Sequence, residues 1–195
     1  MSWFRRTPLA AARWAAIDCE TSGLDAARDR LLSVGAVVVA DGRIQLPSYF
    51  EAYVKQAAPS AAANILVHGI GGDAQLSGLP LPEVIGELSA RVGGAIPVGF
   101  HAPFDADILR RHGFRVQEKW LDLAALAPAL FPGRKAQALE EWLAEFGIAV
   151  HARHEALGDA FSTAQLLLVL LAEAKRQGID TVQGVRAAQH QGRWL

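Results

Sequence analysis

The chain has 195 residues, a formal net charge of −1 at pH 7 and one cysteine, Cys19. A single cysteine excludes an intrachain disulfide and a cysteine-rich zinc site, and it fits a protein of the reducing cytoplasm. The near-neutral charge excludes attraction to nucleic acid through bulk charge, so such binding would need a local basic patch. No apolar run reaches the roughly 18 residues of a membrane span, and we expect no contact with a membrane.

The first predicted strand ends in two carboxylates. We expect residues 1–12 to form a short N-terminal extension, and the apolar run over residues 14–17 predicts a buried strand. Because side chains alternate between the faces of a strand, Asp18 and Glu20 should share one face and Cys19 should occupy the other. An isolated pair of this kind is ordinarily the polar end of a strand. Its interpretation therefore depends on the residues that follow.

A three-strand antiparallel meander opens the predicted sheet. Residues 31–39 are β-branched and nearly continuously apolar, as in a central strand. Asp41 and Gly42 predict a hairpin turn, and residues 43–54 predict one continuous return strand.

Strands and helices alternate in the second half of the chain. Pro97 lies in a predicted strand over residues 95–100. Because proline cannot donate a ladder hydrogen bond, it indicates either an edge position or limited pairing of this strand. Apolar spacing predicts helices over residues 82–92, 103–112, 121–131, 136–146 and 159–177. This order predicts an α/β fold, with a mixed sheet flanked by helices, in one domain over residues 13–178. Residues 179–195 form a C-terminal tail to which the sequence assigns no role.

Two aspartates of the predicted helix 103–112 differ in their surroundings. Asp107 lies three and four residues before Arg110 and Arg111, which is the pattern of a solvated ion-pair face. Asp105 instead shares its stripe with the apolar residues that face the core. A carboxylate in the first turn also interacts favourably with the helix dipole, so a purely stabilising role for Asp105 is the alternative.

The last candidate residues are His154 and Asp159. Asp159 opens the most apolar predicted helix, where an aspartate is ordinarily the N-cap, and His154 lies in a loop just before it. Together with Asp18, Glu20 and Asp105, Asp159 makes four carboxylates, which cannot share a buried site as anions without cations between them. Oxygen ligands of this number suit Mg²⁺ or Mn²⁺. A nearby histidine would complete a two-metal hydrolase.

Three segments resemble, in order, the exonuclease motifs of the DEDDh (DnaQ-like) 3′→5′ exonucleases, a family that includes the proofreading epsilon subunit of bacterial DNA polymerase III. They are Ile17-Asp-Cys-Glu-Thr-Ser-Gly-Leu24, Val98-Gly-Phe-His-Ala-Pro-Phe-Asp105 and His154-Glu-Ala-Leu-Gly-Asp159-Ala160. The resemblance covers about residues 14–175 and implies an RNase H-like fold.

The resemblance also implies roles for individual residues. It implies two metal ions per site, held by Asp18, Glu20, Asp105 and Asp159, with His154 as the general base for the attacking water. It implies a pocket for the terminal nucleotide, in which Leu24 wedges against the base. The pocket residues are Thr21, Gly23, Leu24, Val67, His68 and Phe104. For His68, packing within a turn is the alternative.

His101 and Asp122 lie outside the set of predicted site residues. Relatives often have asparagine where this chain has His101, which could change contacts with the nucleic acid. Asp122 matches a frequent family aspartate outside the metal set, and we interpret it as a helix cap.

The function implied is a 3′→5′ exonuclease that releases nucleoside 5′-monophosphates from DNA, acting on single-stranded 3′ ends in proofreading or repair. Proofreading would need a DNA polymerase subunit as partner. RNA 3′-end trimming, as in RNase T-like and oligoribonuclease-like relatives, is the alternative with the same chemistry. A non-catalytic nucleic-acid-binding module is the alternative from another class, and the presence of all five site residues argues against it. Basic residues that could supply local charge are Arg110, Arg111, Arg115, Arg134 and Lys135.

Overall fold

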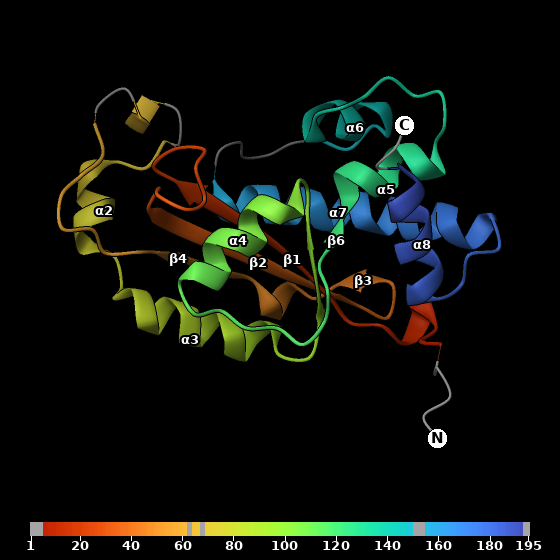
Figure 1. Cartoon of the computed structure of the whole chain (residues 1–195), viewed down its shortest axis with the longest axis horizontal. Helices are drawn as coiled ribbons and strands as arrows, with labels where there is room; N and C mark the ends of the chain where they lie inside the picture. The colour runs from red at the N-terminus through yellow and green to blue at the C-terminus, as the bar shows by residue number, and fades with distance from the viewer. Residues whose placement is uncertain (1–5, 62–63, 67–68, 150–154, 193–195) are drawn as a thin grey trace.

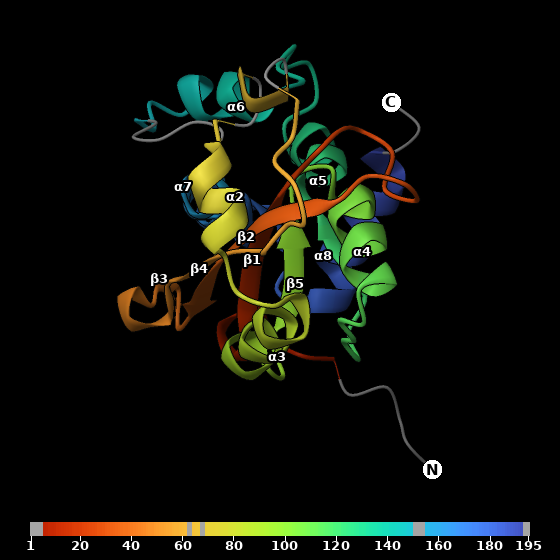
Figure 2. The ribbon, with the colours of Figure 1, turned by 90° about the vertical axis from the view of Figure 1, so that its left-hand side faces the viewer.

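Helices cover both faces of a six-stranded mixed sheet (Figures 1 and 2). The computed structural model describes residues 6–61, 64–66, 69–149 and 155–192. The strands are β1 (Trp14–Thr21), β2 (Leu31–Ala40), β3 (Arg43–Ile44), β4 (Phe50–Tyr53), β5 (Ile96–Gly99) and β6 (Leu121–Asp122). They lie in the order β3-β2-β1-β5-β6, and β4 also pairs with β2. Because β2 is antiparallel to β1 while β5 is parallel to it, the predicted mixed sheet is confirmed.

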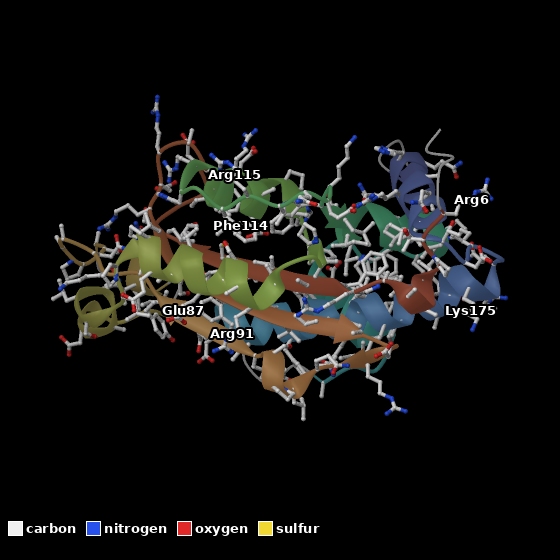
Figure 3. All side chains as sticks on the ribbon, turned by 90° about the horizontal axis from the view of Figure 1, so that it is seen from below. Arg6, Glu87, Arg91, Phe114, Arg115 and Lys175 are labelled. Atoms are coloured by element: carbon white, nitrogen blue, oxygen red, sulfur yellow. The ribbon has the colours of Figure 1, made fainter. Side chains whose placement is uncertain are left out.

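The side chains of β1 alternate between two cores. Trp14 and Ala16 lie in the core formed with α5 to α8, whereas Ala15 and Ile17 lie in the core formed with α3 and α4. The helices are α2 (Gly72–Ser77), α3 (Leu81–Val92), α4 (Ala102–Arg111), α5 (Leu123–Leu130), α6 (Leu139–Glu145), α7 (Ala156–Arg176) and α8 (Val182–Gly192). Two 3₁₀ turns, η1 (Leu9–Ala11) and η2 (Leu46–Ser48), and a helical turn at residues 64–66 complete the described elements. Figure 3 shows α4 and α7 on opposite sides of the strands.

The predicted third strand, residues 43–54, is wrong as a continuous element. It is divided into β3 and β4 by η2, which has proline in its first turn. Pro47 has no backbone N–H to donate to the ladder. At this interruption the Ser48 hydroxyl accepts a hydrogen bond of 2.9 Å from the backbone N–H of Val38 on β2. A side chain thus replaces a strand as the partner of β2.

Of the two alternatives for Pro97, the edge position is wrong, because β5 lies between β1 and β6, and limited pairing is confirmed on the β6 side. Successive residues of a strand direct their backbone groups to opposite neighbours, and the Ile96 N–H donates to Arg13 on the β1 side. The nitrogen of Pro97 is therefore directed towards the β6 side. Pairing with β6 begins only at Val98, so the missing N–H of Pro97 costs no ladder hydrogen bond.

Helix α7 passes through the core along the sheet, and its interior leucines Leu166, Leu167 and Leu170 are fully buried. By length and composition alone α7 is apolar enough to cross a membrane. Its burial against β1 and β2 accounts for that composition.

The C-terminal segment contributes a further core helix, α8. Val182 and Val185 of α8 are buried in the same core as α7, and α8 lies beside α5 (Figure 1). Residues 182–192, to which the sequence assigned no role, therefore belong to the packed structure.

Candidate active site

Three carboxylates converge where β1 extends past the end of β5. Ligand atoms of Asp18, Glu20 and Asp159 lie within 4.8 Å of one another, and all three side chains are half-buried. Asp18 and Glu20 follow the alternation of β1 onto the α7 face, and Cys19 lies in the opposite core. The predicted division of faces is confirmed.

Asp159 reaches this cluster from the first turn of α7 rather than from its N-cap. The helix begins at Ala156, and its N-cap residue is Glu155. The Asp159 N–H donates to the Glu155 carbonyl at 3.0 Å, which is a hydrogen bond within the helix. The predicted N-cap position of Asp159 is therefore wrong, because the helix starts three residues earlier.

Gly35 and Glu51 bring the start of α7 onto the sheet. Gly35 pairs with Asp18 on one side and with Glu51 on the other. A Cβ at Gly35 would lie 2.2 Å from the carbonyl carbon of Ala156, so only glycine allows this approach. The Glu51 carboxylate accepts a hydrogen bond from the backbone N–H of Leu157, and the N-cap Glu155 makes no side-chain cap hydrogen bond. Glu51 thus satisfies an N–H group at the start of the helix that carries Asp159.

Neither residue is among the site residues that the sequence predicts. A lone glycine within an apolar strand is a signal of close backbone approach, which could have singled out Gly35. Nothing local marks Glu51, because it meets α7 only through the pairing of β4 with β2.

Asp105 approaches the cluster from α4 and is 4% exposed. Its carboxylate accepts hydrogen bonds from the backbone N–H and the thiol of Cys19. The last residue of β1 that pairs with β5 is Ala16, so the Cys19 N–H lies beyond the strand partner on that side. The Asp105 carboxylate takes the place of a strand acceptor there. It is outside the three-residue group defined above, but it is close enough for its charge to raise the pKa of Asp18.

The two aspartates of α4 are separated as the spacing predicts. Asp107 is exposed and forms an ion pair of 2.8 Å with Arg110, whereas Asp105 is buried on the side of Ile108 and Leu109. Arg111 does not join that ion pair. It donates to the backbone carbonyl groups of Ala27 and Asp29.

Burial, together with repulsion between neighbouring carboxylates, raises the pKa values of Asp18, Glu20 and Asp105. Burial raises the pKa of Asp18 well above its usual value, and the charges of Asp105, Asp159 and Glu20 raise it further. Burial and the charge of Asp159 raise the pKa of Glu20 to about 7. Burial raises the pKa of Asp105 to about 8, although the hydrogen bonds from Cys19 oppose this change. Oxygen ligands that repel one another in this way fit a divalent cation between them.

The second motif contains a left-handed residue held by Asp122. His101 has φ 61° and ψ 40°, a region in which asparagine and histidine are both enriched. The Asp122 carboxylate accepts hydrogen bonds from the backbone N–H groups of His101, Ala102 and Ala124, at 3.1, 3.4 and 3.2 Å. The predicted cap role of Asp122 on α5 is confirmed, and the same oxygen also holds the start of α4.

The loop after β1 holds several residues of the predicted nucleotide pocket. The Thr21 hydroxyl donates to the Gly23 carbonyl at 2.6 Å. A Cβ at Gly23 would lie 2.6 Å from a carboxylate oxygen of Asp29, so this turn is closely packed. Leu24 follows and is 94% exposed, as a residue that contacts a ligand would be.

The other pocket residues are only partly described. Phe104 is half-buried in the first turn of α4, next to Asp105. Val67, His68 and His154 lie outside the described residues. Asn64, a few residues before Val67, donates to the Ser22 carbonyl at 2.9 Å.

The predicted basic residues make contacts within the chain. Arg134 forms an ion pair with Glu145, and Arg115 donates to the backbone carbonyl groups of Arg110 and Phe114. Their charges remain at the surface, but these contacts restrict their orientation.

Comparisons with known proteins agree with this arrangement. The sequence profile of the exonuclease family RNase_T matches residues 15–167. A DNA polymerase III subunit epsilon-like protein of Rhodobacter capsulatus is 31% identical over 186 residues, which are 92% of this chain and 26% of that protein. The chain thus spans about a quarter of that relative. The DNA polymerase III subunit epsilon of Treponema pallidum is 28% identical over 169 residues, which are 83% of this chain and 78% of that protein.

The fold has solved counterparts. Exonuclease X, in a complex with 5′ overhanging duplex DNA, superposes with a TM-score of 0.71 at 22% identity and covers 88% of this chain and 99% of that one. This likeness shows the predicted RNase H-like fold, and the profile match covers most of the chain. The chain belongs to the RNase_T exonuclease family.

Proposed function

We propose that the chain is a metal-dependent 3′→5′ exonuclease that releases nucleoside 5′-monophosphates from DNA. The observation that carries the proposal is the convergence of Asp18, Glu20 and Asp159 beside the buried Asp105. Membership of the exonuclease family supports the reaction class.

The site suits Mg²⁺ or Mn²⁺, and we assign Asp18, Glu20, Asp105 and Asp159 as the ligands. Two such cations would supply charge stabilisation for the attacking and leaving oxygens of an in-line displacement at phosphorus. The chain holds the four carboxylates on one strand, β1, and on the first turns of two helices, α4 and α7. Cys19 orients the Asp105 carboxylate through its N–H and thiol.

We assign His154 as the general base that takes the proton of the attacking water, following the family motif. The terminal nucleotide would be held by Thr21, Gly23, Leu24 and Phe104, together with Val67 and His68. The high exposure of Leu24 supports its role as the wedge against the terminal base.

DNA is the substrate that we favour over RNA. Of the relatives named above, one is a DNA polymerase III subunit epsilon and the other is named as epsilon-like, and the structural counterpart is bound to DNA. A polymerase partner, as in proofreading, and a cytoplasmic location belong to the same proposal. The free thiol of Cys19 is consistent with a reducing compartment.

The test is digestion of 5′-end-labelled single-stranded DNA, mismatched duplex DNA and RNA with Mn²⁺, side by side with the Asp18→Ala variant. We expect a ladder that shortens from the 3′ end of DNA, release of nucleoside 5′-monophosphates and no activity in EDTA or in the variant. Faster digestion of RNA would favour the RNA-trimming alternative. Early release of the labelled 5′ nucleotide, or no digestion of any substrate, would contradict the proposal.

A further inference from the structure

Gln189 of α8 makes a buried hydrogen bond to the strand that precedes α5. Its side-chain oxygen accepts from the backbone N–H of Asp122 at 2.9 Å. Gln189 is 5% exposed, and 67 residues separate it from Asp122 along the chain. A buried amide without an acceptor is costly, so this contact fixes α8 and Asp122 relative to each other.

The contact is made at the end of the sheet. β6 is the last strand in the order and has a strand partner on one side only, β5. Gly99 of β5 pairs with Asp122. The Asp122 N–H therefore takes its acceptor from a helix instead of another strand, and α8 closes this edge of the sheet.

Asp122 in turn holds the start of α4. Its carboxylate accepts from the backbone N–H groups of His101 and Ala102, and His101 is in the left-handed conformation. A non-glycine residue in this region persists when its surroundings hold it there. The backbone N–H of Asp122 is thus bonded to Gln189, and its carboxylate is bonded to His101 and Ala102 of the second motif.

Asp105 lies three residues after Ala102, in the first turn of α4. A Cβ at Gly99 would lie 3.1 Å from Ala102 Cα and 3.3 Å from a carboxylate oxygen of Asp105. The start of α4 is therefore packed tightly over the end of β5. A small displacement of residues 101 and 102 would move the Asp105 carboxylate away from Cys19 and Asp18.

We propose that Gln189 is a positioning residue for Asp105, and that α8 acts through Asp122 to hold the second exonuclease motif in place. The inference rests on the proposed role of Asp105 in the active site. On this proposal α8 supports catalysis, although it is distant in sequence from Asp105.

The chain offers a matched control on the same helix. Gln183 is exposed, and its side-chain oxygen accepts from the backbone N–H of Thr7 at 3.1 Å. Gln189→Met and Gln183→Met both remove a glutamine acceptor of a backbone N–H, but only the first touches β6. Gln189→Glu retains an acceptor oxygen at the position and serves as the conservative variant.

The first experiment uses the metal-free protein. Amide hydrogen exchange of His101, Ala102 and Asp122 is measured by NMR in the normal chain and the three variants. We expect faster exchange at all three amides in Gln189→Met, and near-normal exchange in Gln183→Met and Gln189→Glu. Unchanged exchange at His101 and Ala102 in Gln189→Met would overturn the proposal, as would an equal change in Gln183→Met.

The second experiment is a double-mutant cycle with Asp105→Asn, read by calorimetric Mn²⁺ affinity and by turnover rate. Gln189→Met should lower the rate about tenfold, a loss of the size expected for one misplaced hydrogen bond, and it should weaken Mn²⁺ binding. In the Asp105→Asn background it should cause little further loss of affinity, because both changes act on one group. Equal losses of Mn²⁺ affinity in both backgrounds would mean that Gln189 does not act through Asp105, and would overturn the proposal. If Asp105→Asn itself changes neither quantity, the site assignment fails, while the exchange data still decide the Gln189 contact.

Discussion

Gly35 and Ala156 pack backbone against backbone, so closely that a Cβ on Gly35 would lie 2.2 Å from the Ala156 carbonyl carbon. Gly35 pairs with Asp18 in the sheet, and Ala156 is the first residue of the helix that carries Asp159. This contact therefore sets the distance between the first and third motifs. The approach of two carboxylates depends on a residue that has no side chain.

Gly35→Ala should separate α7 from the sheet and weaken metal binding. The added methyl group meets backbone atoms, which cannot move aside as a flexible side chain could. We expect a fall in melting temperature and a loss of Mn²⁺ affinity, measured by thermal unfolding in EDTA and by calorimetry. The matched control is Gly86→Ala on α3, where a Cβ would meet nothing within 4 Å.

The control should stabilise the protein slightly, because alanine has the higher helix propensity. A Gly35→Ala variant with normal Mn²⁺ affinity would show that the Ala156 contact does not set the carboxylate geometry.

Asp105→Asn and Asp107→Asn should change the turnover rate to very different extents, although both residues lie on α4. Asp105 is buried beside Cys19, whereas Asp107 is exposed and pairs with Arg110. We expect Asp105→Asn to reduce the rate by orders of magnitude. The rate of Asp107→Asn should remain within a few-fold of the normal rate, because Asp107 is exposed. Loss of its ion pair should also change stability little, since an exposed ion pair contributes about 1 kcal/mol or less. Comparable rates for the two variants would contradict the assigned roles.

The motifs and the face on which each acid lies were predictable because they depend on local rules. Alternation along β1 placed Asp18 and Glu20 together, and helical spacing distinguished Asp105 from Asp107. The start of α7 was misplaced because Asp159 is a good N-cap residue, and nothing in the local sequence shows that Ala156 can begin the helix against Gly35.

The supports of the site could not be predicted, because they join segments that meet only in the folded chain. Gln189 contacts Asp122 across 67 residues, and no periodicity of either segment indicates the pair. For a related reason, Pro97 indicated limited pairing correctly but an edge position wrongly. Proline generally indicates an edge strand, but here its missing donor is directed to a position that β6 does not occupy.

The metal-free protein should lose stability as the pH rises. The pKa of Glu20 is raised from 4.5 to about 7 and that of Asp105 from 3.8 to about 8. In the unfolded chain both groups ionise near pH 4, while in the folded chain they stay protonated to higher pH. The unfolded state therefore binds fewer protons in between, and stability falls from about pH 4 to about pH 8.

Bound Mn²⁺ should remove the fall of stability with pH, because it favours the ionised carboxylates. For the same reason, Mn²⁺ binding below pH 8 should release protons. The measurements are melting temperature against pH in EDTA and in excess Mn²⁺, and calorimetry in buffers of different ionisation enthalpy. Asp105→Asn should reduce the slope in EDTA. A melting temperature that does not change with pH in EDTA would show that the pKa values of these carboxyl groups are not raised in the folded chain.

His154→Ala should lower the turnover rate while leaving metal binding intact. His154 lies outside the described residues, and its role as general base follows from the family motif. Such a base typically contributes about 10²–10⁴-fold to the rate and works best with a pKa near the operating pH. Nearby cations favour the neutral imidazole, which is the form that accepts a proton. The normal enzyme should gain activity as the pH rises through one histidine-like step in the acidic range, and His154→Ala should lose that step.

The control is His190→Ala, which changes an exposed histidine on α8 and should leave the dependence of the rate on pH unchanged. Because a cation-bound water can ionise in a similar range, the deciding data are Mn²⁺ affinity and single-turnover rate on one preparation of His154→Ala. A collapse of affinity together with rate would make His154 a ligand or a structural residue rather than the base.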